Sequence, residues 1–272
     1  MLLLKKDKYH LASESLAQVS INHLFANAVA QNMLSGMLYA NHSIKPSAFY
    51  VVHPYGLSLL FGTDPDPDFS NLLFGFLLNP NKKSRLDHWI QFWPQAYSSV
   101  ADEQIRALLP SCGARLNKYE RVNFSFNKAK FCSIHQPILP EGCTIIETNQ
   151  QIFENMPGTV IPSRFWDKSD DFLRHGKGFS LINKGQLAST AYSVFVIDNK
   201  MEIGIETIPA FRGKGHALAV CHKMIEYCLQ KNFEPVWACR ADNQQSIALA
   251  IKLGFEETVR IPFFHLTANV SA

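Results

Sequence analysis

Residues 212–217 (Arg-Gly-Lys-Gly-His-Ala) place two glycines and two basic side chains directly before an apolar run of helical period. A glycine inside a helix costs about 0.5–1 kcal/mol relative to alanine, so its use here needs a reason. One reason is a tight turn between a strand and a helix. The other is a bound anion, because the first N–H groups of a helix lack intrahelical partners and carry partial positive charge. Phosphate is a common ligand of such helix N-termini.

Two familiar phosphate-binding patterns do not match this stretch. A Walker A loop needs Ser or Thr after Gly-Lys, whereas Gly215 follows Lys214. A dinucleotide fingerprint needs a third glycine where Leu218 stands. A second Gly-Lys-Gly, at residues 176–178, leads into a predicted strand and is predicted to be a turn.

The residues before the glycines predict a half-buried strand. Apolar side chains at 201, 203 and 205 alternate with Glu202, Gly204 and Glu206, and Pro209 ends the pattern. Glu202 and Glu206 therefore share one face and could handle a proton or bind a cationic amine. The alternative is that both are ordinary polar-face residues of a strand.

The pattern Arg212-x-x-Gly215-x-Ala217 resembles the acyl-CoA pyrophosphate loop of the GNAT superfamily of N-acetyltransferases. The preceding EIGIETIPAFRGKG is similar to the end of that superfamily's fourth strand, and ADNQQSIALAIKLGFEE to the segment that closes its fold. Together these matches cover about residues 178–265. SRFWDKSDDFLRHGKGFSLI and PVWACRADNQQSIALAIKLGF further resemble the subfamily that includes zwittermicin-resistance acetyltransferases.

The resemblance implies an enzyme that transfers an acetyl group from acetyl-CoA directly to a primary amine of a small molecule. It implies that Glu202, ten residues before Arg212, is the first candidate for the base, with Glu206 as the second. The general acid of the superfamily is a tyrosine at a position that Ala250 occupies here, so Tyr192, water or the substrate remain as alternatives. The residues implied to bind the cofactor are Ile205, Thr207, Arg212, Gly213, Lys214, Gly215, His216, Ala217, Asn243 and Ser246. Asn243 is also a good helix N-cap and Gly254 a helix-ending glycine.

The expected fold class is α/β. In the C-terminal half, residues 136–272, we expect a mixed, mostly antiparallel sheet flanked by helices, with strands at 178–183, 187–197, 200–208, 235–240 and 255–265 and helices at 150–155, 170–175, 214–231 and 244–253. An α+β N-terminal domain, residues 1–135, precedes it, and the resemblance implies a degenerate acetyltransferase-like fold there. It lacks Arg-x-x-Gly-x-Ala, so we expect no cofactor of its own. Its predicted elements include a helix over 11–35 ended by Gly36 and strands at 48–52 and 57–61. The HWIQFW run, with Trp89, Phe92 and Trp93, is predicted to be buried helix in preference to the lining of a substrate cleft.

Composition excludes several classes of protein. The chain has 272 residues, 47% apolar and 18% charged, with a net charge of +3, which is globular and gives no strong basic field for nucleic acid. We expect no membrane span and no secretory signal, and hence a cytoplasmic protein that binds neither membrane nor nucleic acid; a homodimer is compatible with the sequence. None of the six cysteines has zinc-site spacing, so no metal is expected; Cys221, Cys228 and Cys239 are predicted to be packing residues. The alternative function is a non-catalytic acyl-CoA sensor, which the missing tyrosine favours.

Overall fold

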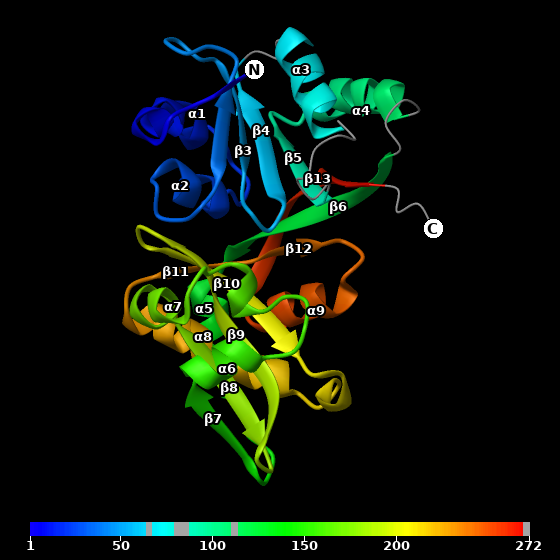
Figure 1. The fold of residues 1–272 in the computed structure, drawn as a ribbon. Coiled ribbons are helices and arrows are strands. Elements are labelled where there is room, and N and C mark those ends of the chain that lie inside the picture. Colours follow the sequence, from blue (N-terminus) through cyan, green and yellow to red (C-terminus); the bar gives the residue numbers. More distant parts are fainter. Residues whose placement is uncertain (64–66, 79–86, 110–113, 269–272) are drawn as a thin grey trace. The chain divides into compact units, whose positions relative to one another are not determined.

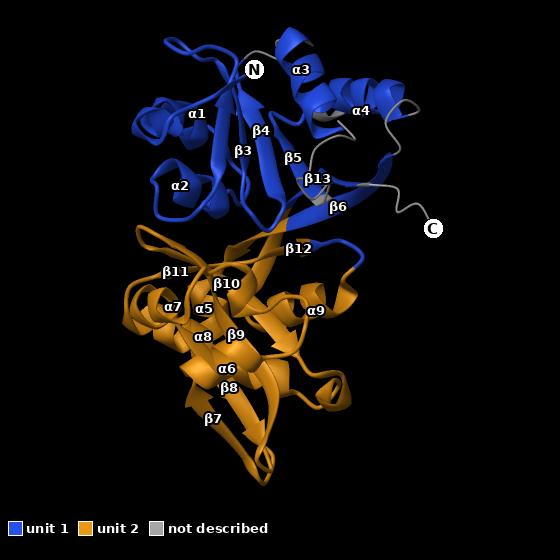
Figure 2. Cartoon of the chain, viewed as in Figure 1, with its two compact units in different colours: residues 1–122, 240–242, 259–272 blue, residues 123–239, 243–258 orange. Residues whose placement is uncertain are grey.

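The computed structural model describes residues 1–63, 67–78, 87–109 and 114–268 (Figure 1). It divides into two compact units, coloured separately in Figure 2. Unit 1 comprises Met1–Val122, Arg240–Asp242 and Val259–Ala272, and unit 2 comprises Asn123–Cys239 and Asn243–Thr258. The division into domains at residues 1–135 and 136–272 stays a prediction.

The N-terminal elements form a sheet, and in chain order the helices come between its strands. The strands are β1 (Leu2–Leu3), β2 (Met37–Ala40), β3 (Ala48–Val52), β4 (Leu57–Gly62), β5 (Asp87–Trp93) and β6 (Ala114–Phe126). The helices are η1 (Lys6–Ala12), α1 (Ser13–Ala17), α2 (Leu24–Ala30), α3 (Pro67–Leu77) and α4 (Tyr97–Leu108). All five residues of β3 are buried, which explains its unbroken apolar sequence.

The C-terminal elements repeat this pattern. The strands are β7 (Cys143–Glu147), β8 (Gly178–Asn183), β9 (Gln186–Ile197), β10 (Lys200–Thr207), β11 (Glu234–Val236), β12 (Ala238–Arg240) and β13 (Phe255–Ala268). The helices are α5 (Lys128–Cys132), α6 (Gln150–Asn155), η3 (Pro162–Arg164), α7 (Ser169–His175), η4 (Pro209–Phe211), α8 (His216–Gln230) and α9 (Gln244–Lys252).

The two sheets share one strand order. Neighbours run β1-β2-β3-β4-β5 in one and β7-β8-β9-β10-β11 in the other. In each, the first three pairings are antiparallel and the last is parallel. The sheet of unit 1 continues through β13, β6 and β12. The predicted class, α/β with mixed and mostly antiparallel sheets flanked by helices, is confirmed.

Most predicted elements of the C-terminal half agree closely with the structure. The helix at 150–155 and the strand at 178–183 have the predicted bounds. The bounds of β9, β10, α8 and α9 differ from the predicted ones by one or two residues at one or both ends. One strand differs. The predicted 235–240 is two strands, β11 and β12, which belong to different sheets and are separated by Trp237.

Three predictions in the N-terminal half are wrong. The helix over 11–35 is broken at residues 18–23, where Leu24 N donates to Asn22 Oδ1 at 3.2 Å and the His23 ring contacts Ile21 O at 2.6 Å. Such local side-chain bonds compete with the helical ladder. Asn32, at φ 58°, rather than Gly36, supplies the left-handed residue after α2. HWIQFW lies in strand β5, which pairs in parallel with β4, rather than in a helix.

Candidate functional site

Residues 212–217, named here the glycine turn, follow the single turn η4 after β10 and lead into the first residues of α8. Gly213 and Gly215 have φ of +76° and +78°, a conformation that strains residues with a side chain. A Cβ built on either glycine would meet no protein atom within 4 Å. The backbone shape therefore demands glycine, and the space above both residues is open. Residues 212–215 are all exposed, so the N-terminus of α8 faces solvent.

Two cations flank the glycine turn. Arg212 Nε donates to the Thr207 carbonyl at 3.1 Å, and the Arg212 side chain is 54% exposed. Lys214 Nζ donates to the Ala210 carbonyl at 3.0 Å and lies 5.3 Å from the centre of the Phe211 ring. Their charges add to the partial positive charge of the helix N-terminus, which suits a phosphate group.

His216 points away from that open space. Its side chain is 2% exposed, and Nε2 lies 3.9 Å from Cys143 Sγ. Burial, followed by the charge of Lys214, lowers the pKa of His216, which favours the neutral ring. A phosphate contact at this position would come from the backbone N–H.

One face of β10 carries the predicted carboxylates. Cys228 Sγ on α8 donates to Met201 Sδ at 3.6 Å, so the side chains in phase with Met201 face α8. Glu202, Gly204 and Glu206 therefore lie on the opposite face. Gly204 is required there because its Cβ would lie 2.7 Å from the ring of Tyr192.

Glu202 stands where the pairing of β10 with β11 ends and its pairing with β9 is interrupted. β11 pairs with β10 over only three residues, and Glu202 opposite Val236 is the last pair. On the β9 side, the register shifts between Met201 and Ile203, which places a bulge opposite Glu202. Beyond Glu202, β9 still pairs with Ile205 and Thr207, but β11 no longer pairs with β10. The edge of β10 on the β11 side is therefore open. Glu202 itself is 7% exposed.

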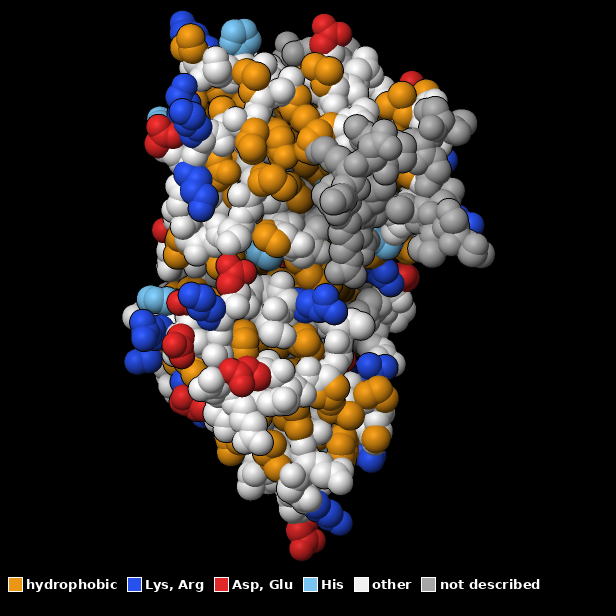
Figure 3. All heavy atoms as spheres, viewed as in Figure 1, with side chains coloured by type: hydrophobic (Ala, Val, Ile, Leu, Met, Phe, Trp, Pro, Cys, Tyr) orange, Lys and Arg blue, Asp and Glu red, His pale blue; other side chains and the backbone are white. Residues whose placement is uncertain are grey.

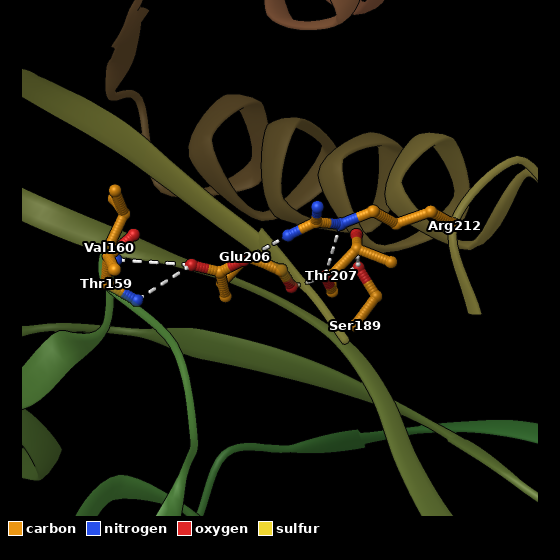
Figure 4. Close-up of polar contacts among 6 residues, drawn as sticks. All are labelled: Thr159, Val160, Ser189, Glu206, Thr207 and Arg212. Atoms are coloured by element: carbon orange, nitrogen blue, oxygen red, sulfur yellow. Dashed lines mark hydrogen bonds and ion pairs between the residues drawn. The ribbon is translucent and has the colours of Figure 1, made fainter. Parts of the chain in front are cut away.

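Glu206 is engaged by three donors. Its carboxylate accepts from Thr159 N and Val160 N, both at 3.2 Å, and lies 3.5 Å from Arg212 Nη2 (Figure 4). Ser189 Oγ lies 2.8 Å from Thr207 Oγ1 beside it. The 158–160 segment is the feature that sequence reasoning missed. Its partner is 46 or 47 residues away, and no local pattern connects the two.

The start of α9 confirms one structural prediction. The Asn243 side chain caps the helix by accepting from Ser246 N at 3.1 Å. Ser246 Oγ accepts from Trp237 Nε1 at 3.1 Å, which ties this hydroxyl to a buried indole. Gly254, at φ +87°, follows α9 as expected.

The position of the missing tyrosine is filled by Ala250, which is fully buried, and the candidate Tyr192 is also 0% exposed. Cys221 and Cys228 are core residues as predicted, and burial raises the pKa of the Cys228 thiol to about 12. Cys239 is half-buried, and Cys112 lies outside the described residues.

The corresponding junction of the N-terminal sheet, between β4 and α3, has the opposite charge. Its sequence is Thr-Asp-Pro-Asp-Pro-Asp at residues 63–68, with three acidic residues and no glycine. A sequence with three carboxylates and no glycine does not favour phosphate, in contrast to the sequence of the glycine turn.

Among the described residues, no group of three or more His, Cys, Asp or Glu side chains could hold a metal ion. No helix in the same part of the chain has the length and apolar character needed to cross a bilayer.

Comparison with known proteins gives consistent results. A family model described as GNAT acetyltransferase matches residues 14–264. The uncharacterized N-acetyltransferase YdfB of Bacillus subtilis (strain 168) is 25% identical over 243 residues, which cover 89% of each chain.

Two solved structures share the fold over nearly their whole length. A GCN5-related N-acetyltransferase-like protein from Streptococcus suis 89/1591 has a TM-score of 0.71 at 19% identity, covering 96% of this chain and 98% of that one. A tandem GNAT protein from the clavulanic acid biosynthesis pathway has a TM-score of 0.64 at 12% identity, covering 100% and 98%. The tandem description agrees with the repeated strand order found here.

Proposed function

The chain belongs to the GNAT acetyltransferase family, and from that premise we propose that it transfers an acetyl group from acetyl-CoA to a primary amine of a small molecule. The observation that carries the proposal is the glycine turn, with two left-handed glycines under open space at the N-terminus of α8. The turn follows a strand with an open edge, so one extended ligand could contact both.

The residues present fit acetyl-CoA. The backbone of residues 212–217 and the Arg212 guanidinium would hold the pyrophosphate, and Lys214 would add positive charge. The edge of β10 at Ile205 and Thr207 would pair with the amide groups of the pantetheine arm. Asn243 and Ser246 would flank this arm from the start of α9, which packs against α8.

Glu202 is the residue we propose as the base. It lies at the point where β11 leaves β10, and its carboxylate would remove a proton from the attacking amine. Direct transfer then forms the amide bond as the thioester bond breaks, and the thiolate that leaves must be protonated. Since Ala250 and the tightly buried Tyr192 offer no exposed hydroxyl, we assign this proton to solvent or to the amine itself.

The second candidate function is a non-catalytic acyl-CoA-binding sensor, and the buried Ala250 at the position of the tyrosine favours it. Binding of nucleic acid has less support, because acidic and basic side chains are interspersed on the face in Figure 3. We further propose membership in the subfamily that includes zwittermicin-resistance acetyltransferases, a cytoplasmic location, and action without a metal, nucleic acid or membrane; a homodimer is the assembly to test.

Thermal unfolding with acetyl-CoA or free CoA tests the binding step. At a ligand concentration of 100 times Kd we expect about 2.7 kcal/mol of stabilisation for the wild-type chain. Arg212→Ala should reduce the shift for both ligands. No shift at millimolar concentration of either ligand would refute the proposal.

Glu202→Gln separates the two candidate functions. In an enzyme, it should abolish acetyl transfer in a screen of primary amines and amino acids while leaving the shift with acetyl-CoA. A wild-type chain that binds acetyl-CoA but acetylates no amine would favour the sensor.

A further inference from the structure

We infer that Glu206 is a positioning residue and not the second candidate base. Its carboxylate holds the 158–160 segment over β10 and orients the Arg212 side chain at the glycine turn. The kinetic part of this inference rests on the proposed function. The structural part can be measured without it.

Both oxygens of the Glu206 carboxylate are already committed. Oε2 accepts from Thr159 N and Val160 N at 3.2 Å each, and Oε1 faces Arg212 Nη2 at 3.5 Å (Figure 4). A base must reach the proton that it removes, whereas hydrogen bonds from two backbone donors hold this carboxylate in a fixed place. This geometry suits a fixed anchor better than a proton acceptor.

Gly158 shows that the segment is shaped to meet this carboxylate. Its φ is +138°, and a Cβ there would lie 2.7 Å from Glu206 Cγ and 2.8 Å from Oε2. A side chain at this position would push the backbone off the carboxylate. Glycine is therefore what allows the two amides that follow to donate to Glu206.

The anchored segment lies on the face where an acceptor must arrive. Glu202 and Glu206 share that face of β10, and the segment between α6 and η3 is held there at Glu206. An amine bound at Glu202 would lie on the same face of β10 as the segment. Arg212 bonds to Glu206 and to the Thr207 carbonyl, so the same carboxylate also orients the cation of the glycine turn. Glu206 thereby connects the acceptor side of β10 with the cofactor side.

Amide hydrogen exchange in the full chain tests the structural part without any ligand. Thr159 is exposed, so protection of its amide depends on this bond. Losing a charge-assisted bond should raise exchange at residues 159 and 160 about tenfold or more in Glu206→Ala. Glu206→Gln keeps an acceptor oxygen and should show a smaller rise, whereas Gly158→Ala, which keeps the carboxylate, should resemble Glu206→Ala.

Glu234→Gln is the matched control. Glu234 pairs at 3.8 Å with Lys200 at the opposite end of β10, and both side chains are about half exposed. The Glu234→Gln substitution removes a carboxylate from the same sheet without affecting the 158–160 segment. Amide hydrogen exchange at residues 159 and 160 should therefore equal that of the wild type. Wild-type exchange at these two amides in Glu206→Ala would overturn the inference.

Kinetics test the role in turnover, with acetyl-CoA and the best acceptor from a screen of primary amines. Glu206→Ala should raise KM for the amine more than it lowers kcat, and Glu206→Gln should recover most of the loss with the acidic limb of the pH profile retained. Equal losses of kcat in the Gln and Ala variants, with that limb gone, would identify a base and overturn the inference. If the wild type acetylates no amine, the proposed function fails, and the exchange result alone decides the role of Glu206.

Discussion

Substituting Gly215 by glutamate separates a phosphate-binding role of the glycine turn from a purely conformational one. Gly185, in the hairpin between β8 and β9, is the matched control. Its φ is +80° against +78° for Gly215, and at neither position would a Cβ meet an atom within 4 Å. The backbone strain of a side chain should therefore be alike, about 1–2 kcal/mol at each site. Both variants should unfold at lower urea concentration than the wild type, with the smaller loss in Gly215→Glu, because its carboxylate gains about 0.3–1 kcal/mol at the N-terminus of α8.

The two variants should differ in their affinity for acetyl-CoA. A carboxylate about 4 Å from a phosphate charge costs about 4 kcal/mol at an effective dielectric constant of about 20, which is on the order of a thousandfold in Kd. Allowing for reorientation of a flexible side chain, we expect Gly215→Glu to weaken binding by at least about 100-fold. Gly185→Glu carries the same new charge in a different loop, outside the glycine turn, and should weaken binding far less than Gly215→Glu.

Isothermal titration with acetyl-CoA measures both affinities, and urea unfolding measures the strain. Comparable Kd values for the two variants and the wild type would refute the reasoning, because the glycines would then serve the backbone alone. A much larger loss of affinity in Gly215→Glu than in Gly185→Glu, with a loss of stability no greater than that of Gly185→Glu, would establish the anion site.

Two further predictions concern stability. Asn243→Ala removes the cap of α9 and should lower the free energy of unfolding by about 0.5–2 kcal/mol in urea titrations, whereas Asn243→Asp should keep it; equal losses in the two would argue against capping. Because burial and Lys214 lower the pKa of His216 below its unfolded value of about 6.5, the unfolded chain binds more protons there, so stability should fall as the pH drops below about 6.5. His216→Gln should make that dependence shallower without removing it, since burial also lowers the pKa of His222, and an unchanged slope would contradict the assignment.

Local chemistry predicted the C-terminal half well. β8, β9, β10 and α8 follow from alternation, helical period and glycine or proline punctuation, all of which act within a few residues. The cap of Asn243 and the left-handed Gly254 follow for the same reason. The roles assigned to site residues from the resemblance stay predictions.

The N-terminal half was harder because its signals are ambiguous over short windows. HWIQFW is apolar enough for a helix or a strand. It forms a strand because it pairs with β4, about 30 residues earlier in the chain. The helix over 11–35 has helical period throughout, but side-chain bonds at Asn22 and His23 interrupt it.

The sequence by itself determined the glycine turn, because its conformation and the helix that follows depend on neighbouring residues alone. Only the tertiary structure decided what surrounds it. At Trp237 the chain leaves the sheet that contains β10, so the edge of β10 beside Glu202 is open. The 158–160 segment donates two backbone hydrogen bonds to Glu206. Both depend on contacts between residues far apart in sequence. Such contacts form only when the sheet has assembled, and no short stretch of residues encodes them.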